Sequence, residues 1–437
     1  MNTKRKTAAA MTIGCRLNQA DTALIYDRLI QAGYEIVPAN APHIDAAIIN
    51  TCTVTSVASQ KSHQAARKWR RQHPESCIVV TGCSSEIERE AWSGEEGVDI
   101  ILSNEEKRSI VSRLEEFFAG THTEDSGFAP LGEDDFLEKA NARFPFRSRA
   151  FLKIQEGCNS FCSYCIVPYA RGRERSRDKN EIVSEFKKFL KDGFKEIILT
   201  GVNICAYDNA GFNLAGIVSE LASIPGHFRI RLSSTEPHPS NLELLEIMEK
   251  HPGKICRFLH LPLQHGSDEI LKSMNRKYTC AEYALFVQEA RRRIPGIHMG
   301  ADIIVGFPGE TDELFQKMRD FIKEMNFANL HIFTYSKREG TPATDFPGQV
   351  PKDTAKQRYN ILTEDSKLTA QEFANSHIGK SIEVLLEKEI RPNVFEGWSD
   401  NYLRIKAHGS NLKQNELHQV QIEKANSKKM LEGTVLA

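Results

Sequence analysis

Short apolar runs alternate with amphipathic segments through the first 118 residues. Four runs are each long enough for one strand, and the segment 18–33 between the first two carries apolar residues at helical spacing. The runs lie at 7–14, 45–50, 77–82 and 98–102. Parallel strands need a crossover connection, so alternation of strands with helices favours a parallel sheet. We therefore predict a small, doubly wound α/β domain over residues 1–118.

The same alternation returns after a break. Residues 119–148 lack periodicity and are rich in acidic and small residues, which is typical of a linker. Between residues 149 and 375, helical segments alternate with six apolar runs, at 150–155, 196–203, 228–234, 258–264, 299–307 and 330–336. Six such units predict an incomplete or complete βα barrel, of the partial TIM type.

The pattern changes again near the C-terminus. A helical segment at 352–377 leads into short alternating runs at 381–389, 394–408 and 418–424, with turn residues between them. Alternation with a period of two, divided by turns, is typical of a small β-barrel. We predict this third domain over residues 376–437.

Composition places the chain among globular proteins. Hydrophobic residues make up 40% and charged residues 26%, and no apolar run approaches the roughly 18 residues that a membrane span needs. The first 15 residues begin with basic residues and a short apolar stretch, which we interpret as a first strand and not as a signal peptide. The expected location is the cytoplasm. A net charge of -1 gives no general case for a polyanionic partner.

Three cysteines each follow an apolar run of the first domain. Cys15, Cys52 and Cys83 stand at the carboxyl ends of the first, second and third runs, whereas Cys77 begins its run. The carboxyl ends of parallel strands share one edge of the sheet, where such folds bind ligands, so these three thiols should meet in space. The alternative is that they are inert, because cysteine is often buried.

A second set of cysteines lies in "GCNSFCSYC", just after the first strand of the predicted barrel. Cys158, Cys162 and Cys165 have C-x3-C-x2-C spacing, and no fourth cysteine or histidine follows at zinc-finger spacing. Three thiolates from one loop suit an iron–sulfur cube with one iron left open to a substrate or cofactor. The alternative is three small buried hydrophobic residues.

This loop resembles that of the radical S-adenosylmethionine enzymes. The resemblance implies that Cys158, Cys162 and Cys165 hold a [4Fe-4S] cluster whose open iron binds S-adenosyl-L-methionine. Reductive cleavage would then give a 5'-deoxyadenosyl radical.

The same resemblance assigns further cofactor contacts. Gly201 and Asn203 in "LTGVN", and Gly306 in "GADIIVGFPGET", look like the family's cofactor-contact segments, and Tyr164 either contacts the adenine or packs the loop. Taken from the residues alone, glycines at strand ends let a bulky ligand approach the backbone. Gly-Phe-Pro-Gly is equally a turn.

The N-terminal motifs narrow the resemblance. "GCRLNQADT", "NTCTVT" and "TGC", followed by the radical barrel and a small β-barrel, resemble the methylthiotransferases over nearly the whole chain. In that family the three N-terminal cysteines bind a second [4Fe-4S] cluster, so the resemblance assigns one to Cys15, Cys52 and Cys83. The C-terminal barrel resembles the RNA-binding TRAM module.

Four segments are most similar to the branch that acts on N6-threonylcarbamoyladenosine at position 37 of tRNA, next to the anticodon. They are "NTCTVT", "KIQEGCNSFCSYCIVPYARGR", "LPLQHGSDEILKSMNRKYT" and "TYSKREGTPA", whereas "TGCSSE" and His265 depart from the expected neighbours. The resemblance implies that the radical abstracts hydrogen from adenine C2 and that a methylthio group, methylated by a second S-adenosylmethionine, joins that carbon. It also requires an electron donor, such as a flavodoxin-type reductant, and a sulfur source.

Three rival functions stay open at this point. A related enzyme would methylthiolate a ribosomal-protein aspartate, and another would act on N6-isopentenyladenosine in tRNA. A non-catalytic alternative is an RNA-binding protein whose iron–sulfur clusters are structural.

A run of basic residues follows the cysteine loop. "RGRERSRDK" contains Arg171, Arg173, Arg175 and Arg177, and basic residues beside a reaction site fit a phosphate-bearing substrate. We predict RNA contacts for these four. A solvated, charged helix start is the alternative.

Overall fold

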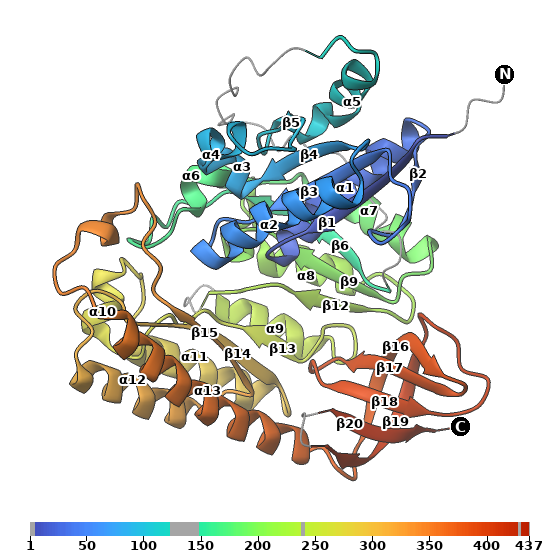
Figure 1. Cartoon of the computed structure of the whole chain (residues 1–437). Helices are drawn as coiled ribbons and strands as arrows, with labels where there is room; N and C mark the ends of the chain where they lie inside the picture. Colours follow the sequence, from blue (N-terminus) through green and yellow to red (C-terminus); the bar gives the residue numbers. More distant parts are fainter. Residues whose placement is uncertain (1–4, 123–147, 237–240, 427–429, 437) are drawn as a thin grey trace.

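The computed structural model describes residues 5–122, 148–236, 241–426 and 430–436, arranged as three successive units (Figure 1). The blue N-terminal sheet lies above a curved central sheet, and a small red barrel lies beside the central sheet. Most of the predicted linker, residues 123–147, lies outside the described residues.

The N-terminal sheet is entirely parallel. Its strands lie in the order β2, β1, β3, β4 and β5. Their bounds are β1 Thr7–Thr12, β2 Glu35–Ile36, β3 Ala46–Thr51, β4 Cys77–Gly82 and β5 Ile100–Ile101. The four predicted runs contain β1, β3, β4 and β5. The periodicity does not predict β2, because two residues are too few to show a pattern.

Helices cover both faces of this sheet. Alternate strand residues such as Ala8 and Ile48 pack with α1 and α5, whereas their neighbours Ala9 and Ile49 pack with α2. The helices are α1 Arg16–Gln31, α2 Ser56–Gln72, α3 Cys83–Ile87, α4 Arg89–Ser93, the 3-10 helix η1 Glu106–Ser109 and α5 Ile110–Phe118. The doubly wound arrangement is confirmed, and the strand order reverses between β1 and β3, which is where such sheets bind ligands.

The central unit is a curved sheet of six parallel strands. Two three-stranded groups, β6-β9-β12 and β13-β14-β15, are joined by bridges from Ile230 to Ile255 and from Ser234 to His260. The strands are β6 Ala150–Lys153, β9 Glu196–Thr200, β12 Arg229–Leu232, β13 Phe258–His260, β14 His298–Val305 and β15 Asn329–Thr334. The prediction of six βα units is confirmed, and the barrel is an incomplete one.

Helices cover the outer face of this curved sheet, where Leu152, Leu199 and Ile303 belong to one large apolar core. The helices of this unit are α6 Val167–Arg171, α7 Lys179–Lys191, α8 Leu214–Ala222, α9 Leu242–Lys250, α10 Asp268–Ser273, α11 Cys280–Arg293, α12 Asp312–Met325, α13 Lys352–Asn375 and the 3-10 helices η2 Ile204–Ala206 and η4 Pro342–Asp345. Short pairs are formed by β7 Gln155–Glu156 with β8 Arg175–Ser176, and by β10 Asp208–Asn209 with β11 Phe212–Asn213.

The inner face of the curved sheet, opposite these helices, is partly covered by the N-terminal domain. Ala20 of α1 packs against Phe151 of β6 and Ile198 of β9, whose sequence neighbours belong to the outer core. The first helix therefore lies inside the curve, and Cys15, the residue before it, is brought to the central unit.

The C-terminal unit is a closed five-stranded barrel in the order β16, β17, β18, β20 and β19. Its strands are β16 Ser381–Arg391, β17 Val394–Ser399, β18 Arg404–His408, β19 Leu417–Ala425 and β20 Leu431–Val435. The single run predicted at 394–408 is two strands, because a turn that includes Tyr402 in the left-handed region, with φ 60°, divides it. The predicted small β-barrel is confirmed.

Buried arginines connect this barrel to the central sheet. Arg229 and Arg231 of β12 are fully buried and both pair with Glu196 at 2.6 Å. Arg229 also donates to the carbonyl of Trp398 at 2.6 Å, and Arg231 donates to that of Asp400 at 3.0 Å. The β17–β18 turn is therefore part of the inner packing of the central unit.

Across the four described ranges, no helix is both long and apolar enough to span a membrane.

Candidate functional site

The structure brings the three N-terminal cysteines to one edge of the parallel sheet. Cys15 follows β1 and caps α1, Cys52 follows β3, and Cys83 begins α3 directly after β4. Gly14 allows the close approach: it has φ +104°, and a Cβ there would lie 2.8 Å from the sulfur of Cys52. The strand-end placement thus collects the three thiols at the point where the strand order reverses.

Burial and the proximity of the other thiols disfavour ionisation of the Cys52 thiol in the metal-free protein. Burial raises the pKa of Cys52 to about 12, and the nearby thiols of Cys83 and Cys15 add to the rise. Thiolates packed this closely repel one another, and a metal that binds them relieves that repulsion. This chemistry is that of a metal-ligating set.

The second set lies in the loop between β7 and α6. The Cys165 amide donates to the carbonyl of Cys162 at 2.9 Å, and the Cys158 amide donates to that of Gly172 at 3.1 Å. Burial raises the pKa of Cys165 to about 12, with the Cys162 and Cys158 thiols as further causes. Backbone hydrogen bonds therefore hold the three cysteines together in one tight loop.

Neighbouring segments fix the shape of this loop. Gly157 has φ +70°, and a Cβ there would overlap the carbonyl of Arg173. Phe161 also takes the left-handed conformation, with φ 43°. The side chain of Asn275 donates to the carbonyls of Ser160 at 3.2 Å and Phe161 at 3.0 Å. A strained loop of this kind persists because its surroundings hold it.

Arg276 places a buried cation beside the loop cysteines. Its guanidinium donates to the sulfur of Cys162 at 3.4 Å and pairs with Glu236 at 3.0 Å. It also lies 4.9 Å from the ring centre of Tyr278. This residue could not be singled out from the sequence. Its only signal is its place in "LPLQHGSDEILKSMNRKYT", because nothing local shows that an arginine there reaches the cysteine loop.

Tyr164 packs toward the segment predicted to contact the cofactor. Its ring meets that of Phe307 edge to face at 6.3 Å, in a small apolar cluster with Met274 and Ile304. Burial raises the pKa of Tyr164 well above its ordinary value. The phenol therefore stays protonated beside the cysteine loop, and a contact with adenine stays a prediction.

The other three predicted cofactor residues have local structural roles. A Cβ on Gly201 would lie 2.8 Å from the carbonyl of Gln155, and one on Gly306, which has φ +73°, would lie 2.6 Å from Cβ of Ala355. Asn203 accepts from the amide of Cys205 at 3.2 Å and caps η2. These contacts explain the residue types without a ligand, so the cofactor role stays a prediction.

Arg171 is not on the surface, which corrects the prediction that it contacts RNA. It is 3% exposed and its Nε donates to the sulfur of Cys83 at 3.2 Å. Its Nη atoms donate to Asp21 at 2.9 Å, to Glu156 at 3.0 Å and to Asn18 at 2.5 Å. A guanidinium enclosed in this way does not reach an RNA phosphate. Instead, it connects the cysteine loop with the N-terminal cysteines.

Two lysines complete this buried network. Lys107 donates to Asp21 at 2.7 Å, and Lys153 donates to it at 3.1 Å and also pairs with Glu156. Burial alone would raise the pKa of Glu156, but Lys153 and Arg171 lower it to about 2. Lysines 107 and 153 likewise hold the pKa of Asp21 well below its ordinary value despite its burial. Both carboxylates are therefore ionised.

The other arginines of the run differ in exposure. Arg177 is also buried, 5% exposed, and pairs with Glu185 at 2.5 Å, so the same correction applies to it. Arg175 is largely enclosed. Arg173 is exposed, and its guanidinium lies 4.6 Å from the ring centre of Phe161. Of the four predicted RNA contacts, Arg173 is the one best placed to meet a phosphate.

Arg338 forms a second connection to the N-terminal cysteines. It lies in "TYSKREGTPA", after β15, and donates to the carbonyl of Thr53 and, at 3.0 Å, to its hydroxyl. It also approaches Glu88 at 3.4 Å. Because Thr53 follows Cys52 directly, the last barrel loop holds the backbone beside that cysteine. The segment resembles a family motif, but nothing in the sequence indicates this contact.

Comparisons with known proteins agree with this geometry. Residues 152–322 match the Radical SAM superfamily, and residues 7–103 match a family described as Uncharacterized protein family UPF0004. Threonylcarbamoyladenosine tRNA methylthiotransferase MtaB of Bacillus subtilis is 36% identical over 412 residues, covering 92% of this chain and 91% of that protein. Similar proteins from four other bacteria carry the same name.

The chain is also similar to a protein with a different printed name and to a solved structure. The tRNA-2-methylthio-N(6)-dimethylallyladenosine synthase of Jannaschia sp. is 34% identical, covering 94% of this chain and 90% of that protein. The solved structure of the radical S-adenosylmethionine methyltransferase TsrM of Kitasatospora setae has a TM-score of 0.59 at 15% identity, covering 78% of this chain and 75% of that one. At this identity the second likeness concerns the fold alone.

Proposed function

The chain belongs to the methylthiotransferase family of radical S-adenosylmethionine enzymes, and on this premise we propose that it converts N6-threonylcarbamoyladenosine of tRNA into its 2-methylthio derivative. The main structural support for this reaction is the short connection between the two cysteine sets. Helix α6 begins at Val167, two residues after Cys165, and its last residue, Arg171, donates to Cys83. Two metal-ligating sets joined this closely suit one reaction that uses both.

The residue types at each set fit an iron–sulfur cluster. Each set offers three cysteine sulfurs, the ligands that such clusters take, and three ligands would leave one iron open. One [4Fe-4S] cluster would be held by Cys15, Cys52 and Cys83, and the other by Cys158, Cys162 and Cys165. When bound, these clusters and S-adenosylmethionine supply a carbon radical and a methylthio group.

The protein's own residues prepare each set for a negatively charged group. Arg276 beside Cys162 and Arg171 beside Cys83 each place a buried guanidinium against a sulfur. A cation next to a thiolate stabilises the ionised form that binds metal. Glu236 orients the first of these arginines, at 3.0 Å. The packing of Tyr164 against the apolar cluster of Phe307, Met274 and Ile304 restricts water next to the loop, which would protect a reactive radical.

The substrate is an RNA, so phosphate contacts are expected near the loop. Arg173 stacked on Phe161 provides an exposed cation and an aromatic surface in the same place. The small C-terminal barrel is the TRAM-like unit and provides a further RNA contact. An electron donor, such as a flavodoxin-type reductant, and a sulfur source act with the enzyme in the cytoplasm.

The direct test is mass spectrometry of nucleosides from total tRNA in cells with and without the gene. Deletion should remove 2-methylthio-N6-threonylcarbamoyladenosine, and the precursor should accumulate. Plasmids encoding Cys158→Ala or Cys52→Ala should fail to restore the modification, whereas the control Cys280→Ala, outside both sets, should restore it. Unchanged tRNA nucleosides in the deletion strain would refute the assignment.

The same measurement separates the rival substrates. Loss of 2-methylthio-N6-isopentenyladenosine would assign the enzyme to the branch of the Jannaschia relative. Loss of a methylthiolated ribosomal aspartate would instead indicate a protein substrate.

A second experiment, on purified and anaerobically loaded protein, tests whether the two cysteine sets have different roles in the reaction. Cys158→Ala should abolish formation of 5'-deoxyadenosine, and Cys52→Ala should retain it. Retention in both would exclude radical chemistry at the loop.

A further inference from the structure

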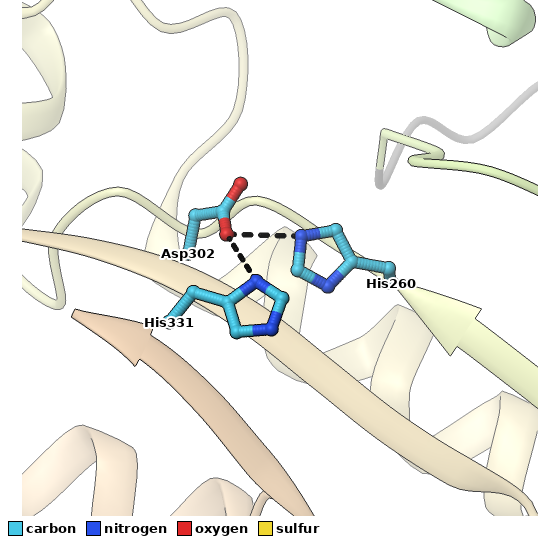
Figure 2. A group of neighbouring side chains, drawn as sticks. All are labelled: His260, Asp302 and His331. Atoms are coloured by element: carbon cyan, nitrogen blue, oxygen red, sulfur yellow. Dashed lines mark hydrogen bonds and ion pairs between the residues drawn. The ribbon is translucent and has the colours of Figure 1, made fainter. Parts of the chain in front are cut away.

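Three polar side chains meet on the inner face of the curved central sheet. Figure 2 shows His260, Asp302 and His331, which come from the neighbouring strands β13, β14 and β15. Parallel pairing sets Asp302 directly opposite His331, and His260 opposite Gly300, two residues before Asp302. The residues on either side of each one pack into the outer core: Leu259, Leu261, Ala301, Ile303, Leu330 and Ile332. Strand alternation therefore turns all three inward.

One carboxylate oxygen joins the two imidazoles. Oδ1 of Asp302 lies 3.0 Å from Nε2 of His260 and 3.2 Å from Nδ1 of His331. All three potential ligand atoms lie within 4.8 Å of one another. Pairs of ligand atoms 3.0–3.2 Å apart, each about 2.1 Å from an ion, would subtend angles of about 90–100°. Those angles are the ones that an octahedral ion requires between adjacent ligands.

The surroundings leave this group accessible. The side chains of His260, Asp302 and His331 are 11%, 23% and 55% exposed, so an ion can approach from the His331 side. Gly300 leaves room for the first ring, because a Cβ there would lie 3.2 Å from Nδ1 of His260. With neutral imidazoles, which metal binding requires, the group carries the single negative charge of the carboxylate. That charge favours a cation over an anion.

We propose that His260, Asp302 and His331 bind one divalent transition-metal ion at a site separate from both cysteine sets. Two imidazoles and one carboxylate are the ligands of Fe²⁺, Mn²⁺ and Zn²⁺ sites, and three protein ligands leave coordination positions open. The open positions face the interior of the curved sheet and would carry water or an oxygen atom of a substrate. The alternative, which the experiment must exclude, is that the three residues only form hydrogen bonds with one another and bind no metal.

Manganese is the appropriate probe, because Mn²⁺ prefers nitrogen and oxygen ligands and competes poorly for the cysteines. The full chain, with both clusters loaded anaerobically, is titrated with Mn²⁺, and the electron paramagnetic resonance signal of free Mn²⁺ is measured. We expect one bound ion per chain. Asp302→Asn and His331→Gln should each weaken binding at least 10-fold, because each removes a direct ligand. Iron content and cluster absorbance should be unchanged in both.

His408→Gln is the matched control. His408 also pairs with a carboxylate, Glu432, at 2.7 Å, but no second histidine among the described residues joins that pair. His331 is more than half exposed, so its substitution leaves the fold intact even where Asp302→Asn does not. The proposal is overturned if the wild-type protein binds no Mn²⁺, Co²⁺ or Zn²⁺ beyond its clusters. It is equally overturned if His331→Gln binds Mn²⁺ as tightly as the wild type and the control.

Discussion

Arg171→Met should weaken the N-terminal cluster without unfolding the protein. The buried network around this residue contains two carboxylates, Asp21 and Glu156, and three cations, Lys107, Lys153 and Arg171. With all five ionised the network carries one positive charge in excess. Without Arg171 the remaining charges balance. Arg171 donates to the sulfur of Cys83 at 3.2 Å, so the excess positive charge stabilises the thiolate form of Cys83 that binds iron.

The magnitude follows from this contact. A hydrogen bond to a charged group contributes about 1.5–3 kcal/mol, so its loss should weaken iron binding at the N-terminal set by about 10- to 150-fold. The metal-free protein should lose less than the roughly 3–5 kcal/mol typical of a broken buried ion pair, because the lysines still neutralise both carboxylates. The two effects can be measured separately.

The assay is a chelator competition on anaerobically loaded protein. Cys158, Cys162 and Cys165 are replaced by alanine so that only the N-terminal set holds iron, and loss of cluster absorbance is followed as chelator is added. Arg171→Met should shift the midpoint to a lower chelator concentration by the factor given above. Arg173→Met, whose exposed side chain lies two residues away, should leave it unchanged. If the Arg171→Met protein is folded and its midpoint is unshifted, the charge of Arg171 does not stabilise the N-terminal cluster.

Three further predictions concern other parts of the molecule. Glu196→Gln leaves two fully buried arginines without their carboxylate, so the free energy of unfolding in urea should fall by about 3–5 kcal/mol. Glu289→Gln, which removes a partly exposed partner of Arg292 and Arg293, should change it far less. Burial would raise the pKa of Glu196, but its arginine partners hold it well below 4.5; its contribution is therefore complete above that pH and lost as pH falls. Unfolding free energies measured between pH 6 and pH 3.5 should fall more steeply for the wild type than for Glu196→Gln, and equal slopes would contradict the pairing. Arg173→Gln should reduce tRNA affinity and lower the slope of log affinity against log salt by about 0.7 for one lost phosphate contact; an unchanged slope in filter binding would remove Arg173 from the RNA surface.

The cysteine positions could be predicted because they depend on local pattern and a general topological rule. Each N-terminal cysteine follows an apolar run, and parallel strands bring their carboxyl ends to one edge. The six βα units of the central domain and the small β-barrel follow from periodicity in the same way. The C-x3-C-x2-C spacing needs no tertiary information at all.

The role of Arg171 could not be predicted, because its burial depends on a helix that lies 150 residues earlier in the chain. A basic run with charges on both sides has the pattern of a surface segment. The docking of α1 places Asn18 and Asp21 against Arg171, whereas Arg177 pairs with Glu185 of α7. The polar group of Figure 2 did leave a signal. His260, Asp302 and His331 each interrupt an apolar run, but the register that unites them comes from strand pairing.

The two buried arginines of β12 also affect how the chain folds during its synthesis. Arg229 and Arg231 complete their hydrogen bonds on the carbonyls of Trp398 and Asp400, about 170 residues further along the chain. At 5–20 residues per second, the ribosome takes about 10–30 s to add that length. Until then, two guanidinium groups and their carboxylate remain only partly satisfied in the nascent central domain. We therefore expect a chain that terminates before residue 398 to retain an incompletely packed central sheet, which chaperones and proteases would recognise.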